Sequence, residues 1–349
     1  MKRMLKVKKS IDMGLGLGRL YARALTGETV IRDFITVGAG DQLRERVYLV
    51  ADGQVRQVTG NQWLLGLDPR VVGIWDPDLG AKGFSGKFPA LPGPCKLYMC
   101  DAMQGAEGDI AVDTELTEDA IAEQALGVME LDYKDQVAEH DGTLLLFRVL
   151  STRIRHIDRM RAWLLYQKFY RKPGVTFERL KAVAAAYSYP RRVRIISFRF
   201  DDDNNYIFPM DLLADIRPVH RYLLGMRHSN QVLKRILDDG RIVVAEAPAN
   251  YKQVIYTLGR NHSAAPPPLD QLPFGVISTD RFGFYLPEWV ESYKEIRITK
   301  TRDLGSHMLL CGEWTEDVIL KPATPRLHHL HFLYFLHQKG GCLGYPIVS

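Results

Sequence analysis

Short runs of apolar and β-branched residues dominate the first 150 positions, a pattern typical of strands. Two of these runs, 47–51 and 54–59, flank Asp52-Gly53, and this spacing predicts a tight β-hairpin. Similar runs predict further strands at 63–65, 71–75, 96–100 and 143–150. Residues 76–95 are rich in Gly and Pro, so we expect a loop there.

The middle of the chain changes to the 3.6-residue period of helices. Residues 157–171 place apolar side chains on one face and end at Pro173-Gly174. Thr176 offers an N-cap to a second helix over 177–186. A shorter helix is predicted over 117–125, where a threonine precedes acidic residues. We expect the pair of longer helices to bridge two β domains.

Strands return after residue 190, with short helices predicted over 232–237 and 252–258. Apolar or alternating runs occupy 193–200, 206–208, 222–226, 241–246, 293–299, 307–314 and 328–335. Many strands with few helices indicate a barrel or a sandwich, so the fold class is mainly β. Both β halves have a hairpin, an apolar strand, a long excursion and two late strands. This order is compatible with a duplicated domain, although the residues do not match.

These patterns divide the chain into three parts. Residues 1–150 are a β-rich N-terminal domain of unknown role, residues 151–189 are a helical connector, and residues 190–349 are a second β domain. No apolar run reaches the ~18 residues of a membrane helix, and no apolar stretch follows the basic start of the chain. The four cysteines form no C-x-x-C pair. We therefore expect a cytoplasmic protein that is not bound to membranes.

Charge is placed unevenly, although the net charge is only +5. Residues 101–141 hold 13 acidic residues and one lysine, whereas 151–199 hold 13 Lys or Arg and two acidic residues. The simplest interpretation is two surfaces that attract each other, within the chain or between chains. A scaffold that recruits partners through these blocks is an alternative. A nucleic-acid partner is not expected, because no recognised nucleic-acid motif accompanies the basic block.

Three stretches of the second half carry a resemblance to a known family. They are Phe208-Pro209-Met210-Asp211-Leu212, then Arg227 to Ile236 with Asp239 to Val244, and finally Asp303 to Glu313. Together they resemble the flavin reductase-like FMN-binding split-barrel family. The resemblance implies a split barrel in the C-terminal half, bound FMN, and flavin reduction by NAD(P)H. It also implies paired barrels with the flavin between them, either in a homodimer or, if the N-terminal half is a second, degenerate barrel, within one chain.

The sequence departs from the family at three places. Ser306 stands where the family often has Asp, and Ala245 or Glu246 stands where it often has Asn. The segment 209–211 replaces a run of small hydroxyl residues. These departures affect the hydrogen bonds expected at the flavin ring and at the nicotinamide, but not the barrel itself.

The residue types of 227–230 suit a phosphate. Arg227, His228, Ser229 and Asn230 bring a cation and short polar donors together, and a helix starting near Asn230 would add backbone N–H groups. Pro209, Met210 and Asp211 could present backbone groups to the edge of the flavin ring. His262 and Ser263, in the loop that starts at Gly259, could close over the phosphate or the ribityl chain. The alternatives are a surface arginine with a helix cap, a plain strand end, and a solvated loop.

Histidines near the C-terminus are the remaining candidates. The resemblance places His307 beside the flavin, where it would orient the nicotinamide or polarise it rather than transfer a proton. A hydrogen-bonded strand histidine is the alternative. His329 and His331 would share one face of a strand and could ligate a metal or haem, whereas a histidine-rich strand near a subunit contact is the simpler interpretation.

The sequence therefore favours an FMN-binding flavoprotein that acts as an NAD(P)H-dependent flavin reductase or a related oxidoreductase. A non-catalytic flavin- or haem-binding protein is the alternative. The expected ligands are a flavin and a nicotinamide dinucleotide.

Overall fold

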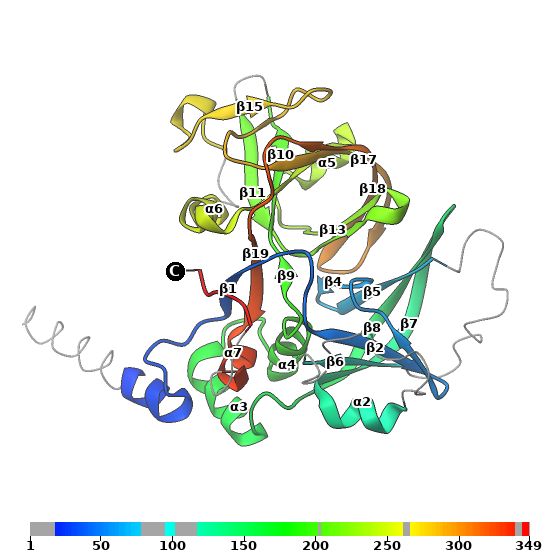
Figure 1. Ribbon diagram of the computed structural model, residues 1–349, viewed down its shortest axis with the longest axis vertical. Coiled ribbons are helices and arrows are strands. Elements are labelled where there is room, and N and C mark those ends of the chain that lie inside the picture. The colour runs from blue at the N-terminus through cyan, green and yellow to red at the C-terminus, as the bar shows by residue number, and fades with distance from the viewer. Residues whose placement is uncertain are drawn as a thin grey trace, which may run out of the picture.

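The computed structural model describes residues 18–77, 95–101, 117–201, 204–260, 266–338 and 344–348. Within these residues the chain forms two seven-stranded antiparallel sheets, a three-stranded sheet between them and a small two-stranded sheet (Figure 1). The fold is mainly β, as the sequence predicts. No helix in the described part of the chain has the length and the apolar character needed to span a bilayer.

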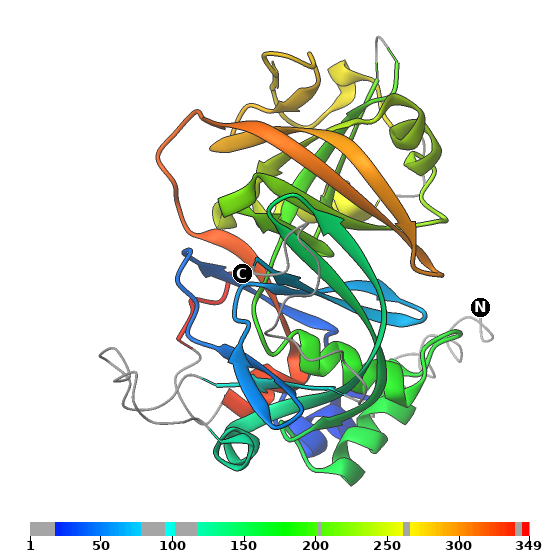
Figure 2. The ribbon, with the colours of Figure 1, turned by 90° about the vertical axis from the view of Figure 1, so that its right-hand side faces the viewer.

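Each large sheet is built from one half of the chain. The N-terminal sheet contains β2 (Arg46–Ala51), β3 (Gln54–Gln57), β4 (Gln62–Leu67), β5 (Arg70–Asp76), β6 (Cys95–Cys100), β7 (Ala125–Glu139) and β8 (Gly142–Ile154). The C-terminal sheet contains β10 (Arg194–Arg199), β11 (Asn205–Met210), β12 (Leu213–Ile216), β13 (Arg221–Arg227), β14 (Arg241–Glu246), β17 (Ser292–Asp303) and β18 (His307–Ile319). Figure 2 shows both sheets curling, with the long hairpins β7–β8 and β17–β18 curving across them.

The two large sheets have the same topology. Their strand orders are β3-β2-β6-β7-β8-β5-β4 and β11-β10-β14-β17-β18-β13-β12. The two orders are identical when β2 to β8 are matched, in sequence order, to β10, β11, β12, β13, β14, β17 and β18. Every neighbouring pair in both sheets is antiparallel. Two bulges flank residues 131–133 in β7 and residues 296–298 in β17. The duplicated order of elements that the sequence suggested is therefore present.

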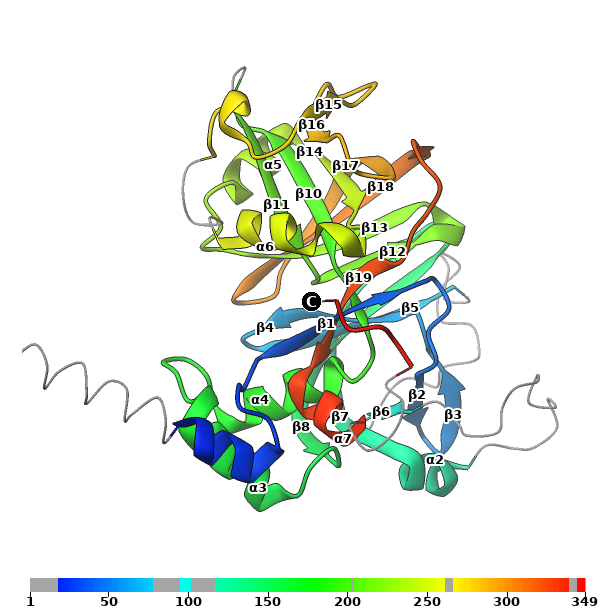
Figure 3. The same ribbon diagram turned by 60° about the vertical axis from the view of Figure 1, so that its left-hand side comes forward.

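Shorter elements connect and cover the sheets. The three-stranded sheet contains β1 (Phe34–Ala39), β19 (Arg326–His331) and β9 (Arg191–Arg192), and the small sheet contains β15 (Val276–Ser278) and β16 (Tyr285–Pro287). The α-helices, besides helical residues 18–26, are α2 (Glu118–Gln124), α3 (Arg159–Leu165), α4 (Phe177–Ala186), α5 (Leu233–Asp239), α6 (Lys252–Arg260) and α7 (Phe332–Gln338). The other helical turns are the π-helix η1 (Tyr166–Tyr170) and the 3-10 turns η2 (Arg217–Val219), η3 (Ala249–Tyr251) and η4 (Leu269–Gln271). Helix α6 lies across β11, and β1 with β19 runs between the two large sheets (Figure 3).

Local sequence explains helix α4, which later forms one wall of the site. The Thr176 hydroxyl accepts a hydrogen bond from the backbone N–H of Arg179 and so caps the first turn. Leu180 and the alanines at 182, 184, 185 and 186 are buried, and they pack the helix against β7, β8 and β19. Its bounds agree with the predicted helix over 177–186.

The two large sheets pack on each other through a shared core. Trp63, Leu65 and Leu144 from the N-terminal sheet meet Ala214, Leu223 and Leu309 from the C-terminal sheet. A Cβ at Gly225 in β13 would lie 2.0 Å from the Leu65 carbonyl oxygen, so the two backbones approach closely there. Each sheet also has a core of its own.

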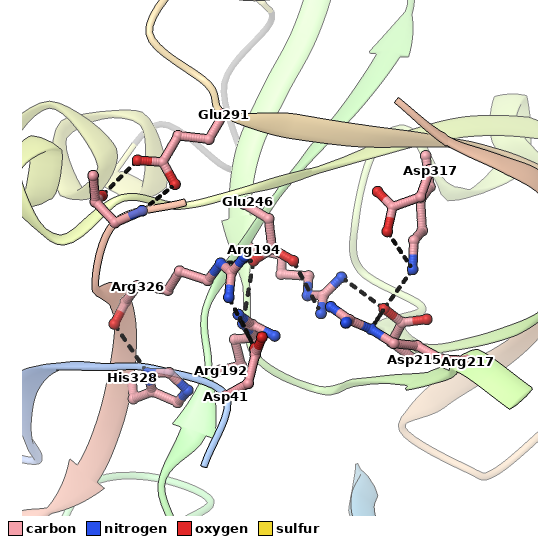
Figure 4. Close-up of polar contacts among 12 residues, drawn as sticks. Asp41, Arg192, Arg194, Asp215, Arg217, Glu246, Glu291, Asp317, Arg326 and His328 are labelled. Carbon is pink, nitrogen blue, oxygen red and sulfur yellow. Dashed lines mark hydrogen bonds and ion pairs between the residues drawn. The ribbon is translucent and has the colours of Figure 1, made fainter. Parts of the chain in front are cut away.

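Buried ion pairs connect β10 to β14 and to β12 (Figure 4). Arg194 lies 3.2 Å from Glu246 of β14 and 3.3 Å from Asp215 of β12, and each of the three side chains is at least 94% buried. Glu246 also contacts Arg192 at 3.1 Å. Asp41, in the loop after β1, reaches Arg192 at 2.9 Å. The network ties the loop after β1 to the C-terminal sheet.

Candidate functional site

A cavity of about 460 Å³ opens between the connector helix α4 and the ends of β11 and β13. This volume lies within the roughly 300–1,000 Å³ of cofactor and ligand pockets. Its walls come from all three parts of the chain: Phe34 from β1, Leu67 from β4, Arg179 and Tyr187 from the connector, and residues 208–212 from β11 and the segment after it. The site is therefore built by long-range packing and not by one local motif.

Most residues predicted from the sequence line this cavity. They are Pro209, Met210, Asp211, Arg227, Ser229, Asn230 and His307, and Gly259 joins them. His228 is adjacent in sequence but is not among the lining residues; its Nε2 lies 3.1 Å from Oδ1 of Asp303. His262 and Ser263 lie outside the described residues.

The helix expected to start near Asn230 begins later, and that prediction is wrong. Helix α5 starts at Leu233, after a turn in which the Asn230 side-chain oxygen accepts the backbone N–H of Val232. Neither Val232 nor Leu233 lines the cavity. The polar groups that 227–230 offer to a ligand are therefore side chains rather than a helix N-terminus.

Two guanidinium groups make the cavity electropositive. Arg227 comes from the end of β13, and Arg179 comes from the first turn of α4. Burial, followed by the positive charge of Arg227, lowers the pKa of Arg179, and the negative charge of Asp68 opposes this shift. Arg179 donates to the Gly174 carbonyl oxygen at 3.0 Å, and among the described residues neither arginine forms an ion pair with a carboxylate. A dianionic group between them would satisfy both.

Sequence reasoning did not single out Arg179. The only signal in the sequence was the excess of basic residues over 151–199, which does not show which of them face the site. Lys172 also lines the cavity, but Asp33 lies 3.5 Å from its Nζ.

His307 is a buried lining residue whose ring is fixed by a contact at Nδ1. The Ser306 hydroxyl lies 2.7 Å from Nδ1 of His307 and accepts the backbone N–H of Asp68 at 2.9 Å. Burial, then the charges of Arg227 and Arg179, lower the pKa of His307 to about 4, so the imidazole is neutral near pH 7. When Ser306 donates to Nδ1, Nε2 carries the remaining proton. That buried Nε2 has no hydrogen-bond partner among the described residues.

A contact between two turns sets the position of His307. The Ser306 backbone N–H donates to the Asp68 carbonyl at 2.7 Å, which joins the β17–β18 turn to the β4–β5 turn of the other sheet. Gly305 has a φ of +90°, and a Cβ there would lie 2.5 Å from Cδ of Pro69. The close approach therefore requires glycine. Ser306, a departure from the family, is thus part of the contact between the two sheets.

The histidines of β19 have different partners. His329 Nδ1 donates to Asp211 at 2.7 Å, whereas His328 Nδ1 lies 3.0 Å from the Arg326 carbonyl oxygen. His331 is buried, and its Nδ1 accepts the backbone N–H of Leu333. The described residues contain no group of three or more His, Cys, Asp or Glu side chains arranged to hold a metal ion.

Comparison with known proteins finds a likeness only among solved structures. No family model matches the chain, and no curated protein does. The NADH:FAD oxidoreductase SgcE6 of Streptomyces globisporus C-1027 is 14% identical over 43% of this chain and 88% of its own, with a TM-score of 0.38. The styrene monooxygenase flavin reductase of Pseudomonas putida S12 is 12% identical over 41% and 89%, with a TM-score of 0.36.

An FMN-binding protein from Thermus thermophilus is also similar, at 13% identity over 46% of this chain and 89% of its own, with a TM-score of 0.36. These structural neighbours are flavin reductases and FMN-binding proteins, the family that the sequence motifs resemble.

The side chains that line the cavity match the chemical groups of FMN. The two arginines without carboxylate partners suit a phosphate dianion, and the Ser229 hydroxyl lines the same cavity. Phe34, Tyr187 and Met210 offer apolar surface to a planar ring. His307 adds an orphaned buried nitrogen that a ring heteroatom could satisfy. The donor set fits a flavin mononucleotide.

Proposed function

We propose that this chain is an FMN-binding oxidoreductase of the flavin reductase type, with NAD(P)H as the electron donor. The observation that carries the proposal is that Arg179, Arg227 and His307 line one cavity, and that Nε2 of His307 has no hydrogen-bond partner among the described residues. Two arginines that form no ion pair with a carboxylate among the described residues point to an anionic ligand. The apolar residues Phe34, Tyr187 and Met210 in the same lining suit a ligand with a flat ring, and FMN combines both features.

Each residue has a separate role in this proposal. Arg179 and Arg227 bind the phosphate, with each hydrogen bond to it contributing about 1.5–3 kcal/mol. Residues 209–211 offer backbone groups to the ring edge. His307, neutral at pH 7, donates from Nε2 and orients the ring or the nicotinamide without transferring a proton. Bound FMN supplies hydride chemistry that the side chains of the protein lack.

The duplicated topology supports one site within one chain. The bulges place residues 131–133 of β7 in correspondence with residues 296–298 of β17. When the strand pairing is followed from there, through β8 to β5 and through β18 to β13, Trp75 corresponds to Gly225. Trp75 packs against Gly142, where a Cβ would lie 2.4 Å from its ring, and the cavity beside it measures only about 10 Å³. The bulky indole therefore fills the position that corresponds to a lining residue of the first cavity. We propose one FMN per chain, held between paired barrels of the same molecule.

Reconstitution tests this function directly. The purified full chain is loaded with FMN, and oxidation of NADH and of NADPH is followed by absorbance, with free FMN at equal concentration as the reference. We expect oxidation well above that of free FMN and about one FMN released per chain on denaturation. Bound FMN without nicotinamide oxidation would leave a flavin carrier rather than a reductase. Failure to bind FMN would overturn the proposal.

A matched variant pair shows whether the activity belongs to this cavity. Arg227→Gln removes a lining cation, whereas Arg297→Gln removes an exposed arginine on β17 that does not line the cavity. We expect the first substitution to weaken FMN binding and the second to leave it unchanged.

A further inference from the structure

A second cavity, of about 480 Å³, shares part of its wall with the first. Both are lined by Pro209, Met210, Asp211 and Gly259. The second is also lined by Val193, by Tyr256 of α6 and by His329 of β19. Val193, Pro209 and Met210 give it apolar walls, and its hydrogen-bonding side chains are those of Tyr256, His329 and Asp211. Apolar walls with a few convergent polar groups are typical of a small-molecule site.

The three polar side chains form one hydrogen-bonded chain. Asp211 Oδ2 lies 2.7 Å from Nδ1 of His329, and Nε2 of His329 lies 2.7 Å from the Tyr256 hydroxyl. The Thr36 hydroxyl also contacts the Tyr256 hydroxyl. Phe34 stacks on the His329 ring at 5.4 Å between centroids, so the imidazole is held from its face as well as from both nitrogens.

Electrostatics assign a protonation state to both ends of this chain. Burial raises the pKa of Asp211, but the hydrogen bond and the charge of His329 outweigh burial, and the pKa lies below its usual value. Asp211 is therefore a carboxylate and accepts the Nδ1 proton. Burial raises the pKa of Tyr256 to about 12, so its hydroxyl keeps its proton at neutral pH. A phenol in this state both donates and accepts hydrogen bonds.

We propose that this cavity binds a quinone, with one quinone oxygen hydrogen-bonded to the hydroxyl of Tyr256. The inference rests on the proposed function and names the class of electron acceptor that would bind in the cavity next to the proposed flavin site. Among the described lining residues there is no Lys or Arg, so the cavity offers no counter-charge to a phosphate or a carboxylate. A neutral, flat ligand fits the apolar walls.

The hydroxyl of Tyr256 matches both members of a quinone and hydroquinone couple. Its one proton, donated to Nε2 of His329 in the absence of ligand, turns to the carbonyl oxygen of the quinone, and its oxygen accepts the O–H of the hydroquinone, so one residue binds substrate and product.

The reaction balances with the co-substrate already proposed. Overall, a quinone, NAD(P)H and one proton give a hydroquinone and NAD(P)⁺, with the hydride and its electron pair originating in the nicotinamide. The additional proton leaves the Tyr256 hydroxyl as the new O–H bond of the product forms. Tyr256 recovers its proton from solvent, and Nε2 of His329 accepts a hydrogen bond from the restored hydroxyl. General acid assistance of this kind is typically worth about 10²–10⁴ in rate.

Two probes test the proposal, one of which needs no cofactor. p-Nitrophenol resembles a hydroquinone and changes its visible spectrum when its hydroxyl environment changes, so its affinity can be measured on the chain without FMN. Menadione serves as the quinone substrate for the FMN-loaded chain with NADH. Tyr256→Phe is compared with Tyr251→Phe, a tyrosine that stacks on Trp289 and does not line this cavity.

We expect Tyr256→Phe to weaken p-nitrophenol about two- to tenfold, as the loss of one neutral hydrogen bond predicts. It should also slow menadione reduction on the order of 100-fold. Tyr251→Phe should change neither. Equal p-nitrophenol affinity in wild type and Tyr256→Phe would overturn this inference. Because p-nitrophenol binding needs no FMN, a chain that bound it through Tyr256 but took up no FMN would overturn the proposed function and leave this site standing.

Discussion

Arg179 and Arg227 face one cavity although they lie on separate elements, the first on connector helix α4 and the second at the end of β13. Their positive charges repel, and that repulsion is a cost when the cavity holds no anion. An anionic ligand removes the cost and gains hydrogen bonds to both. Under the proposed function, the pair would select a ligand that bears a phosphate.

Removing either arginine should lower FMN affinity but leave riboflavin affinity unchanged. FMN differs from riboflavin by its phosphate, so the comparison isolates the role of the two cations. We expect Arg179→Gln and Arg227→Gln each to weaken FMN about 10- to 100-fold, from about 1.5–3 kcal/mol per charged hydrogen bond. Quenching of flavin fluorescence measures both ligands. Equal losses for the two flavins would place the arginines away from the phosphate.

Stability should fall on mild acidification because several histidines are buried in the neutral form. Burial is the main cause that lowers the pKa to about 4 for His307 and to about 3 for His156, His328 and His331. In the unfolded chain these groups take up protons near pH 6.5. Between these values the unfolded state binds more protons, so the free energy of unfolding decreases as the pH falls from about 6.5 to 4.

Urea denaturation at about pH 7.5 and about pH 5 measures this decrease. His307→Gln should show a smaller decrease than wild type, since it removes one of the titrating groups. His140→Gln, at a side chain that is 89% exposed, should show the wild-type decrease. A pH dependence identical in all three proteins would contradict the assignment of His307.

Gly305→Ala should destabilise the chain more than an equivalent change elsewhere. Gly305 and Gly174 both have positive φ, +90° and +74°, but a Cβ at Gly174 meets nothing within 4 Å. Gly174→Ala therefore reports the conformational cost alone, about 1–2 kcal/mol. Gly305→Ala adds a clash with Pro69, which we expect to cost a further ~1–3 kcal/mol. Similar losses in denaturation experiments would mean that the β4–β5 and β17–β18 turns do not touch in solution.

Arg194 and Arg217 both contact Asp215, yet their substitution should have different effects. The Arg194 side chain is 4% exposed and also contacts Glu246, whereas that of Arg217 is 48% exposed. Arg194→Met removes the buried cation between Glu246 and Asp215, which keep Arg192 and Lys294 as partners. We therefore expect a loss of about 1.5–3 kcal/mol in the free energy of unfolding, as for a lost hydrogen bond to a charged group. Arg217→Met should cost at most about 1 kcal/mol. Comparable losses would show that the buried charges of Figure 4 are solvated.

Sequence patterns predicted the elements whose signals are local. The Asp52-Gly53 hairpin, the helix over 177–186 and the strand over 241–246 are all present, because turn chemistry, capping and apolar runs decide them. Strand β7 was missed, since its many acidic residues hide the alternation. Its Glu139 pairs with Arg221 and Lys300 of the other sheet, which no local pattern shows.

The apolar run over 328–335 was too long for one element. It splits at Phe332 into strand β19 and helix α7, and the backbone N–H of Phe332 is bonded to the Asp33 carbonyl at that point. His329 was interpreted as a strand histidine, and its position in β19 agrees. Its partners Asp211 and Tyr256 lie on other elements, so the hydrogen-bonded chain could not be read from spacing.

Because the matching sheets belong to one polypeptide, dilution cannot separate them. A site shared by independent subunits would empty as the protein concentration fell below their dissociation constant, whereas here the effective concentration of one sheet at the other is fixed by the connector. The two halves are also free of any requirement to be identical. One can keep glycine at 225 while the other carries an indole at 75, a combination that a symmetric assembly of identical chains could not contain.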